Sequence, residues 1–446
     1  MKNFIVNRAR NVELGLIAIS FLIAGYAHWL VQIATKQVYE ISPIWLVVIG
    51  TGALALHLVV RFLAPAADPY LLPMALLLNL LGLVMIHRLD AADLIRSDEP
   101  TQVSLEAPNQ LTWFFVGIAA VSVGLMIVRD HRLIQRFTFT AMLIGFVLLL
   151  LPLVPGLGAT INGARLWVRV AGYSFQPAEF AKIALAIFFA AYLARTRLSI
   201  QSIKTRFFGI GIPRVQDLGP IVIAWLVSIL VLVSQRDLGT SLLFFGLFVG
   251  LLYVATGQRT WLAIGAIMFS AGALIAYSLF SHVRLRATVW LDPFSYANAE
   301  GYQLLQALYG FASGGILGQG WGEGFTWLVP YANSDFILAA FGEELGYAGM
   351  AGLVLIYAIL VQRGLRIAMS ARDDFGSLLS IGLSLVLALQ LFVVFGGVTR
   401  LIPLTGLTAP FLAAGGSSLI SNWIMIGLLI RISHTTNLLN RPAGEV

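Results

Sequence analysis

The chain has 446 residues, of which 59% are apolar and only 11% charged. A soluble domain averages about 25% charged residues, so this composition excludes an ordinary soluble protein and predicts a polytopic membrane protein. The formal net charge of +7 fits cytoplasmic loops beside anionic lipid, and no basic patch with interleaved aromatic residues points to nucleic acid. The absence of cysteine excludes disulfides, thiolate metal sites and a cysteine nucleophile.

Twelve apolar segments are long enough to cross the hydrocarbon core, which takes about 20 helical residues. They predict an all-α fold with about twelve transmembrane helices, at residues 13–34, 43–64, 69–88, 111–128, 137–155, 177–195, 217–234, 238–256, 260–282, 335–362, 375–398 and 406–432. The first apolar run is too long for a cleaved signal peptide, so we expect it to be retained.

The distribution of Lys and Arg predicts the orientation of these helices. With the N-terminus inside, eighteen of the 28 basic residues fall on inner segments and nine on outer ones, while Lys182 lies within a span. This ratio predicts a multi-pass protein with both termini, including the short tail 435–446, in the cytoplasm.

Two of the outer segments are long. Residues 90–110 are acidic and polar, as expected of a solvated loop. Residues 283–334, between the ninth and tenth of the twelve predicted helices, contain ten Trp, Tyr and Phe residues, which predicts a folded outer cap and not a disordered loop. The working face of the protein is therefore expected to be the outer one.

Three polar clusters interrupt the apolar segments at the outer side. In the first, NGARLWVRVAGYSFQPAEFAK (162–182), Asn162-Gly163 predicts a turn and Gln176-Pro177 opens a helix. Glu179 and Lys182 then share one helix face, where they can form an internal ion pair. Alternatively, Arg165, Arg169 and Lys182 together leave a cationic excess beside a helix start, which suits phosphate.

The second cluster is NSDFILAAFGEELG (333–346). Asn333 or Ser334 can cap a helix in which Asp335 stands in the first turn. That reading does not account for Glu343 and Glu344, more than two turns deeper. On a continuous helix one of these glutamates can face the same cavity as Asp335, while the other should pair with a different helix.

The third cluster is TRLIPLTGLTAPFLAAGGSSLISNW (399–423), where prolines, glycines and serines break an apolar run. It is either a kinked packing helix or broken backbone that lines a wet cavity. The glycine-rich stretch 312–324 lacks a phosphate-loop pattern and is a weak signal alone. The six histidines show no ligand spacing.

Together these motifs resemble the SEDS family (shape, elongation, division and sporulation), which includes the RodA and FtsW proteins. The matching motifs, in order, are NGAR-W with QPAEFAK (162–182), QRDLGTS (235–241), LDP with GYQ and ASGG-LG-G (291–320), and SDFILAAFGEELG followed by PLTGLTAPF-GGSS (334–418). The resemblance covers roughly 69–434 and implies a ten-helix core preceded by two additional helices in 1–68. The two added helices and the short tail look more like the RodA branch. Asn333 stands where the family often has His.

The resemblance implies a peptidoglycan glycosyltransferase that polymerises lipid II on the outer face of the bacterial cytoplasmic membrane, in elongation or division, beside a class B penicillin-binding protein. It implies that the essential aspartate is Asp335, with further sensitive positions at Arg165, Glu179, Lys182, Asp237, Ser417 and Ser418. Other expected substrate-binding residues within or near these motifs are Trp167, Gln176, Arg286, Gln303, Ser334, Glu343 and Arg400.

Residue chemistry is compatible with this activity. Inversion at the sugar needs one carboxylate base, for which Asp335 is the candidate, and cations to stabilise the departing diphosphate. A divalent cation (Mg or Mn), held by Asp335 and Glu343 if it has protein ligands, is expected, and no organic cofactor. A flippase for lipid-linked precursors and a non-catalytic scaffold for a transpeptidase remain as alternatives.

Overall fold

The computed structural model describes residues 2–36, 43–98, 103–161, 164–170, 172–201, 205–207, 210–212 and 215–440. The first half of the chain forms α1 (Lys2–Ala34), α2 (Pro43–Leu63), α3 (Leu71–Arg96), α4 (Ala107–Ile127), η2 (His131–Phe137), α5 (Thr138–Leu150), η3 (Leu151–Leu153), α6 (Pro177–Gln201) and α7 (Val215–Gln235). The second half forms α8 (Leu238–Thr256), α9 (Thr260–Leu279), α10 (Ser281–Leu291), η4 (Phe294–Tyr296), α11 (Tyr302–Gly314), η5 (Thr326–Leu328), α12 (Ile337–Ser370), α13 (Asp374–Val398) and α14 (Gly416–Leu439).

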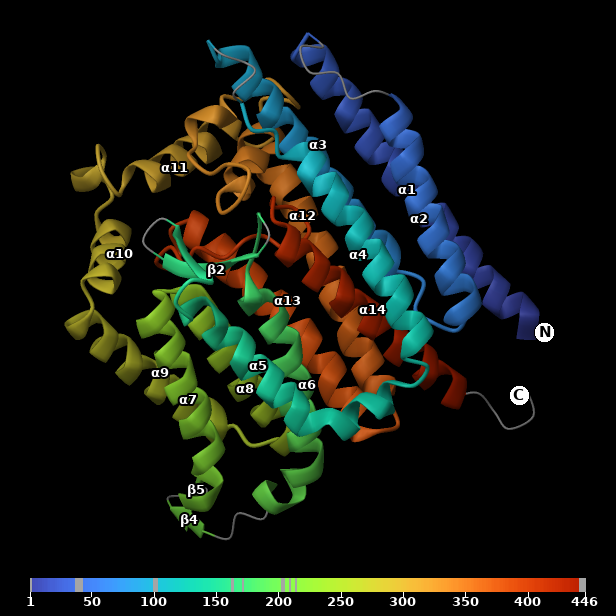
Figure 1. Cartoon of the computed structure of the whole chain (residues 1–446), viewed down its shortest axis with the longest axis vertical. Helices are drawn as coiled ribbons and strands as arrows, with labels where there is room; N and C mark the ends of the chain where they lie inside the picture. Colours follow the sequence, from blue (N-terminus) through green and yellow to red (C-terminus); the bar gives the residue numbers. More distant parts are fainter. Residues whose placement is uncertain are drawn as a thin grey trace.

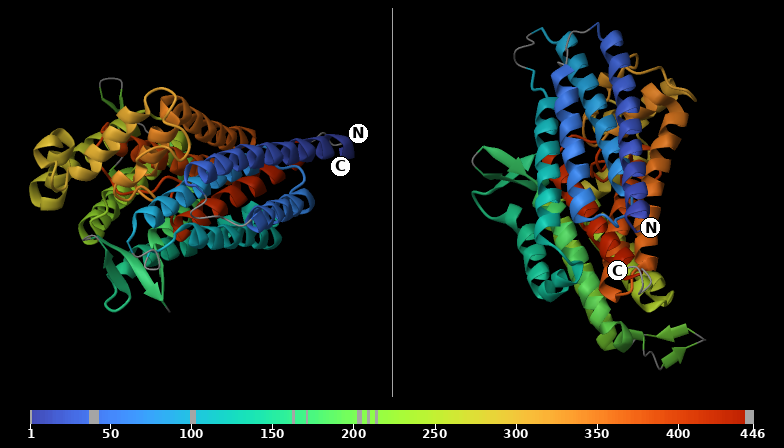
Figure 2. Two further views of the ribbon diagram at one scale, coloured as in Figure 1. Left: turned by 90° about the horizontal axis from the view of Figure 1, so that it is seen from above. Right: turned by 90° about the vertical axis from the view of Figure 1, so that its right-hand side faces the viewer.

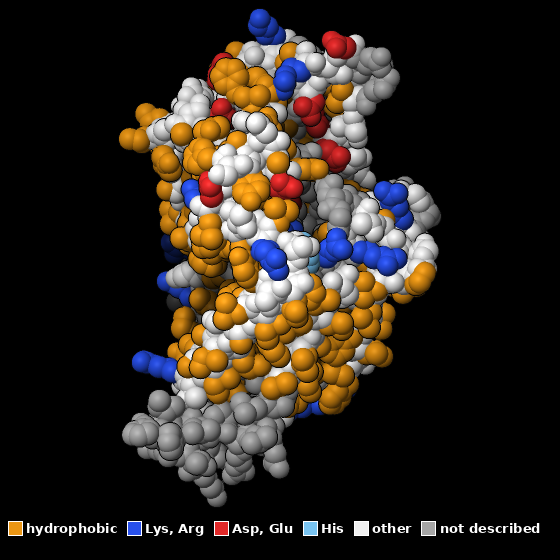
Figure 3. All heavy atoms as spheres, turned by 90° about the vertical axis from the view of Figure 1, so that its left-hand side faces the viewer, with side chains coloured by type: hydrophobic (Ala, Val, Ile, Leu, Met, Phe, Trp, Pro, Cys, Tyr) orange, Lys and Arg blue, Asp and Glu red, His pale blue; other side chains and the backbone are white. Residues whose placement is uncertain are grey.

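The predicted polytopic helical fold is confirmed. Among the described residues, eleven helices are long and apolar enough to cross a membrane. The predicted span 217–234 coincides with α7, whose described apolar part, Trp225–Gln235, is shorter than a span. Seen from the side, apolar side chains cover a broad lower band of the molecule and acidic side chains gather above it, as expected of a protein embedded in lipid (Figure 3).

The centre of the bundle is built around α3, which is buried on all sides. Its sequence LLPMALLLNLLGLVMI has no polar face, and a helix that is apolar all round belongs in a core. α3 packs against α1, α12 and α14, while α6 packs against α5, α8 and α13 (Figures 1 and 2). The additional helices α1 and α2 lie along one side of this bundle (Figure 1).

Two short sheets were not expected from the sequence. β1 (Gly158–Ile161), β2 (Ala164–Val170) and β3 (Tyr173–Phe175) form an antiparallel sheet in the order β1-β2-β3, with Val168 opposite both Gly158 and Phe175. β4 (Thr205–Phe207) and β5 (Ile210–Ile212) form a hairpin. The predicted turn at Asn162-Gly163 lies outside the described residues. The alternating stretch RLWVRV in β2 is a strand pattern that is easily missed among long apolar helices.

The last predicted span, 406–432, was wrong at its start. Residues 401–415 are not helical, and α14 begins only at Gly416. Pro403 and Pro410 each lack a backbone donor, and Gly406 and Gly415 have positive φ angles of 81° and 152°, so a continuous helix is excluded here. Of the two readings of this segment, broken backbone is therefore the correct one.

The outer segment 283–334 is folded, as predicted. It contains α10, η4, α11 and η5, and α11 packs against α12. These elements surround the upper part of the bundle near the sheet β1–β3 (Figure 1). They bring residues from the second half of the chain to the start of α12, where a cavity of about 670 Å³ lies.

Candidate active site

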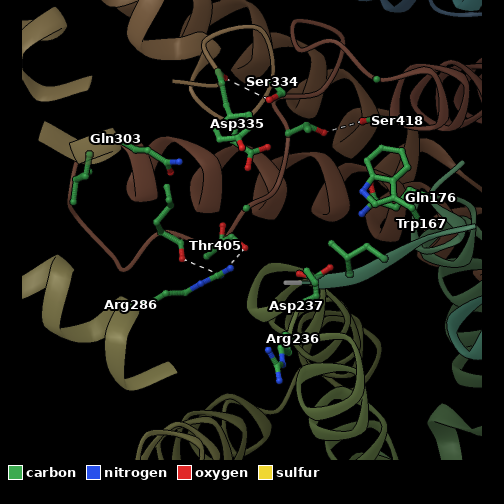
Figure 4. Close-up of a pocket in the computed structure, with 18 of the residues that line it drawn as sticks. Trp167, Gln176, Arg236, Asp237, Arg286, Gln303, Ser334, Asp335, Thr405 and Ser418 are labelled. Atoms are coloured by element: carbon green, nitrogen blue, oxygen red, sulfur yellow. Dashed lines mark hydrogen bonds between the residues drawn. The ribbon is translucent and has the colours of Figure 1, made fainter. Parts of the chain in front are cut away.

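A cavity of about 670 Å³, lined by both polar and apolar side chains, opens where several segments meet. Its lining comes from β2, the turn between α7 and α8, α10 and α11, the segment before α12, and the broken stretch 404–418 (Figure 4). Of the predicted site residues, the cavity brings together Trp167, Gln176, Asp237, Arg286, Gln303, Ser334, Asp335, Ser417 and Ser418.

Asp335 reaches the cavity because it precedes the helix. The amides of Ser334 and Phe336 both donate to the Tyr331 carbonyl, at 3.0 and 3.2 Å, so the chain turns tightly here. α12 starts at Ile337 without a side-chain cap, and the Ser334 hydroxyl bonds to the Tyr331 carbonyl instead. The expected helix cap was therefore wrong. The turn directs the half-buried Asp335 carboxylate into the cavity (Figure 4).

Arg286 of α10 faces Asp335 across Gly406. A Cβ at Gly406 would lie 3.8 Å from Asp335 Oδ2 and 4.0 Å from Arg286 Nη2, so the two side chains flank this glycine. The Arg286 Nη1 donates to the carbonyls of Leu404 and Thr405, at 3.2 and 3.0 Å. The broken backbone thus orients the guanidinium toward the carboxylate, and Arg286 has charge interactions with both Asp335 and Asp237.

The electrostatics of the cavity favour a proton acceptor at Asp335. Burial raises the pKa of Asp335 to about 6, Arg286 opposes this shift, and Asp237 adds to it. Burial also raises the pKa of Asp237, which accepts from the Thr240 amide at 2.9 Å as the N-cap of α8. A carboxyl group with a pKa near the working pH is suited to general-base catalysis.

Serine hydroxyls fix the floor of the cavity. Ser417 accepts from the Gln176 amide at 2.9 Å, and Ser418 bonds to the Thr408 hydroxyl at 3.2 Å. These bonds tie the start of α6 and the broken stretch to the start of α14, so the irregular backbone is satisfied by protein.

Glu179 and Lys182 lie beneath this floor and do not line the cavity. Their ion pair measures 2.6 Å, and Lys182 also donates to Gln390 and Asn422, each at 3.1 Å. Ser421 donates to Glu179 at 3.0 Å. Of the two readings of this motif, the internal ion pair is therefore the one the geometry favours, because all three ammonium hydrogens have protein acceptors.

Lys182→Met is expected to destabilise the protein by about 3–5 kcal/mol, because it leaves the Glu179 carboxylate buried without a partner. The double variant Glu179→Gln/Lys182→Met removes both charges and should recover a large part of that loss. Thermal unfolding of the purified variants in detergent measures both effects. Equal midpoints of thermal unfolding for the single and double variants would show that the loss does not come from an unpaired Glu179 carboxylate.

Three predicted residues besides Glu179 and Lys182 also lie off the cavity. Arg165 is beside the lining on β2, and its Nε has no hydrogen-bond partner among the described residues. Arg400 donates to the carbonyls of Trp290 and Leu291 and so holds the end of α10. Glu343 is buried and accepts from the Phe325 amide at 3.0 Å, away from Asp335.

The position expected for Glu343 depended on a continuous helix from Asp335, and this premise was wrong. Because the helix begins two residues later and a turn precedes it, the rotation between the two carboxylates does not follow helical geometry. Glu344 does pair with another helix, as expected for one of the two glutamates: its carboxylate lies 3.0 Å from Arg88 of α3.

Sequence reasoning missed several lining residues. Arg236, Trp290, Glu300, Tyr331, Thr405 and Gly406 all face the cavity. Arg236 adjoins Asp237 in the motif QRDLGTS, and its positive φ of 59° marks a tight turn that the three-residue spacing between spans already indicated. No local signal distinguished the others.

The carboxylates do not form a metal cage. No group of three or more His, Cys, Asp or Glu side chains among the described residues is placed to hold an ion. Asp335 and Glu343, the expected ligands, are not brought together.

Comparison with known proteins identifies the family. The model of the FtsW, RodA and SpoVE family, described as "Cell cycle protein", matches residues 68–438. The chain belongs to this family. Helices α1 and α2 precede the matched residues.

Relatives within the FtsW/RodA/SpoVE family support the RodA branch. The peptidoglycan glycosyltransferase RodA of Mycobacterium tuberculosis (strain H37Rv) is 46% identical over 428 residues, 95% of this chain and 90% of that protein. RodA of Mycobacterium leprae is 47% identical over 389 residues, 86% of this chain and 82% of that protein. A probable peptidoglycan glycosyltransferase FtsW of Geobacter sp. is 32% identical, covering 82% of this chain and 96% of that protein.

Solved structures of the family share the fold. A structure titled "Structural coordination of polymerization and crosslinking by a peptidoglycan synthase complex" superposes with a TM-score of 0.59 at 25% identity, over 79% of this chain and 96% of that chain. The rod shape determining protein RodA of Thermus thermophilus superposes with a TM-score of 0.57 at 23% identity, over 82% of this chain and 96% of that chain.

Proposed function

We propose that this protein polymerises lipid II into peptidoglycan glycan strands by an inverting glycosyl transfer that releases polyprenyl diphosphate. The relatives named peptidoglycan glycosyltransferase, at 46% identity over most of the chain, support the reaction class. The single structural observation that carries the proposal is the Asp335 carboxylate facing Arg286 in a polar cavity. A flippase or a passive scaffold would not require that pair.

In this proposal Asp335 acts as the general base. Its carboxylate accepts the proton of the acceptor hydroxyl as that oxygen bonds to the anomeric carbon of the donor sugar. The bond from the same carbon to the diphosphate breaks, and its electron pair leaves with the diphosphate. A single inversion needs no enzyme nucleophile, in contrast to retaining hydrolases.

Arg286 and Arg236 are the cations best placed for the departing diphosphate. Both line the cavity, whereas Lys182 and Arg400 do not. A guanidinium group can form bidentate hydrogen bonds to two phosphate oxygens. Its positive charge stabilises the negative charge that develops in the transition state. Trp167 and Trp290 supply flat surfaces on opposite segments of the same cavity for sugar rings.

A divalent cation is proposed to enter with the diphosphate and not to reside in the protein. The described residues offer no three-ligand site. Mg²⁺ keeps several waters and is commonly held by phosphates with one or two carboxylates. No step of the mechanism above is assigned to the ion.

The cavity is proposed to face the outer side of the bacterial cytoplasmic membrane, with both termini in the cytoplasm. The distribution of basic residues supports this orientation. The two ends of the chain also meet on one side: Arg10 of α1 donates to the Ala67 carbonyl, and the neighbouring Ala66 amide donates to His434 of α14, at 2.5 and 3.1 Å.

A class B penicillin-binding protein is the proposed partner. One chain of a solved peptidoglycan synthase complex superposes with this chain, and that complex coordinates polymerisation and crosslinking. Because a glycosyltransferase supplies only the glycan bond, crosslinking requires a second enzyme.

The pH dependence of polymerisation follows from Asp335. Its pKa of about 6 means that the carboxyl group is protonated and inactive as a base below this pH and ionised above it. The rate at limiting lipid II should therefore rise tenfold per pH unit below about 6 and level off above it. Initial rates between pH 4.5 and 8 measure this. A flat profile would contradict the base assignment.

The proposed function itself is tested by reconstitution. Purified protein, lipid II and Mg²⁺ should give glycan polymer detectable by gel electrophoresis, while a parallel vesicle assay measures lipid scrambling. Polymer without scrambling supports the glycosyltransferase. Scrambling without polymer would replace it with a transporter, and neither activity in a folded preparation would favour a scaffold.

A further inference from the structure

A buried ion pair outside the cavity joins α3 to α12 and to the outer loop. Arg88 Nε lies 3.0 Å from Glu344 Oε1, and the two side chains are 2% and 0% exposed. The other carboxylate oxygen of Glu344 accepts from the Gly322 amide at 2.9 Å, and Arg88 Nη2 donates to the Gly324 carbonyl at 2.9 Å. The pair therefore fixes three segments at once.

The same loop is hydrogen-bonded to a break in α12. The amides of Gln319 and Gly320 donate to the carbonyls of Glu343 and Glu344, each at 3.0 Å, and the amides of Tyr347 and Ala348 donate to the carbonyls of Gly315 and Ile316, each at 2.9 Å. These bonds satisfy backbone groups that lose their helical partners at the break.

Glycine permits this close contact of backbones. Gly346 has φ 64° and ψ −170°, a conformation open to glycine alone, and a Cβ there would lie 2.3 Å from the Gly318 nitrogen. A Cβ on Gly318 would lie 2.1 Å from the Glu344 carbonyl oxygen. The glycine-rich stretch 312–324 is thus explained as a loop that packs into the break.

The break leaves a short, separate section of α12, residues 337–345, with Glu344 near one end and Asp335 just before the other. Nine residues span about 13 Å of helix, too short to bend appreciably. Its hydrogen-bonded far end and its packing against α11 hold this section in place. The direction of the section then determines where Asp335 stands relative to Arg286.

We use the word joint for the contact of residues 315–324 with Arg88 and with the break in α12. The first helix, α1, also packs against this joint. A Cβ on Gly322, whose φ is 84°, would lie 2.5 Å from the Ala34 Cβ and 3.5 Å from the Val31 Cα, both in α1. Trp327, further along the outer segment, lies under two cations of α3, with Arg88 5.6 Å and Arg96 5.2 Å from its ring centre. α1 lies outside the residues matched by the family model.

We infer that Glu344 is a positioning residue for the base Asp335, and that the additional helix α1 supports the joint through Gly322. This inference rests on the proposed function, because it concerns the rate of that reaction. It assigns a task to a buried charge that touches no substrate, and to a helix that contributes nothing to the cavity lining.

The first test compares Glu344→Gln with Glu323→Gln, a matched change at an exposed carboxylate of the same loop. Titration with polyprenyl diphosphate counts the folded sites, and polymerisation is expressed per site. Glu344→Gln should lower kcat per site at least 10-fold with an unchanged KM for lipid II, while Glu323→Gln should match the native protein. A loss confined to the number of sites, or an unchanged rate per site, would overturn the inference.

The second test addresses α1 and changes no residue of the loop or of the ion pair. Ala34→Leu places a larger side chain against Gly322 and should lower the rate per site at least 3-fold, while Ile33→Leu, at the exposed neighbouring position, should leave it unchanged. A native rate per site in Ala34→Leu would refute the part assigned to α1.

The two levels of the proposal fail differently. If the native protein makes no polymer, the proposed function fails. If the native protein is active and Glu344→Gln is equally active per site, only the positioning role fails.

Discussion

Asp335→Asn is expected to abolish polymerisation of lipid II, with a fall of at least about 100-fold, the range typical of losing a general base. The amide is nearly the same size as the carboxylate, so the turn at 331–336, held by backbone hydrogen bonds, should persist. An amide has no lone pair basic enough to accept the proton. Initial rates of polymer formation by the purified variants measure the loss.

Two controls make this result specific. Asp98→Asn changes an exposed carboxylate that is far from Asp335 in the sequence, and it should leave the rate unchanged. Binding of polyprenyl diphosphate to Asp335→Asn should be retained, because the asparagine keeps the shape of the cavity. An Asp335→Asn variant that polymerises at the native rate would remove Asp335 from the mechanism.

Arg286→Met is expected to have the second largest effect, lowering kcat about 100-fold, since it removes a cavity-lining cation proposed to stabilise the departing diphosphate. The same change should move the pH profile. Arg286 lowers the pKa of Asp335, so its removal should raise that pKa above about 6 and shift the acid limb of the profile to higher pH.

Arg286→Lys separates charge from geometry. The ammonium keeps the positive charge near Asp335, but it lacks the planar fork that contacts Leu404 and Thr405 and can bind phosphate oxygens in pairs. The lysine variant should keep the acid limb close to its native position and still lose much of kcat. If neither variant changes the pH profile, Arg286 does not act on Asp335.

Part of the candidate site was predictable because its residues stand next to strong local signals. Asp237 lies in a three-residue turn between two apolar spans, and Ser417 and Ser418 directly follow a stretch of proline and glycine that interrupts an apolar run. Asp335 is a carboxylate at the boundary of a span, where an ionisable side chain is costly and therefore a candidate for function. These features depend on residues close together in the chain.

Other assignments required contacts between distant segments. Arg286 and Arg400 are equivalent by charge and expected side of the membrane, yet one faces Asp335 and the other binds the end of α10. Lys182 looked like a phosphate ligand, but acceptors from α6, α13 and α14 surround its ammonium group. Single-sequence reasoning has no access to those partners.

The amino-acid sequence by itself determined the membrane class, the order of the apolar helices and the position of the broken segment, because hydrophobicity, proline and glycine act on the nearest residues. Only the tertiary structure decided which carboxylates face the cavity. Residues 315–320 enter the break at Gly346. The Glu343 carboxylate then accepts from the Phe325 amide and the Glu344 carboxylate from Gly322 and Arg88, while Asp335 alone of the three reaches the cavity. The direction of a side chain in a bundle depends on how its helix is broken and packed, and that depends on segments far away in the chain.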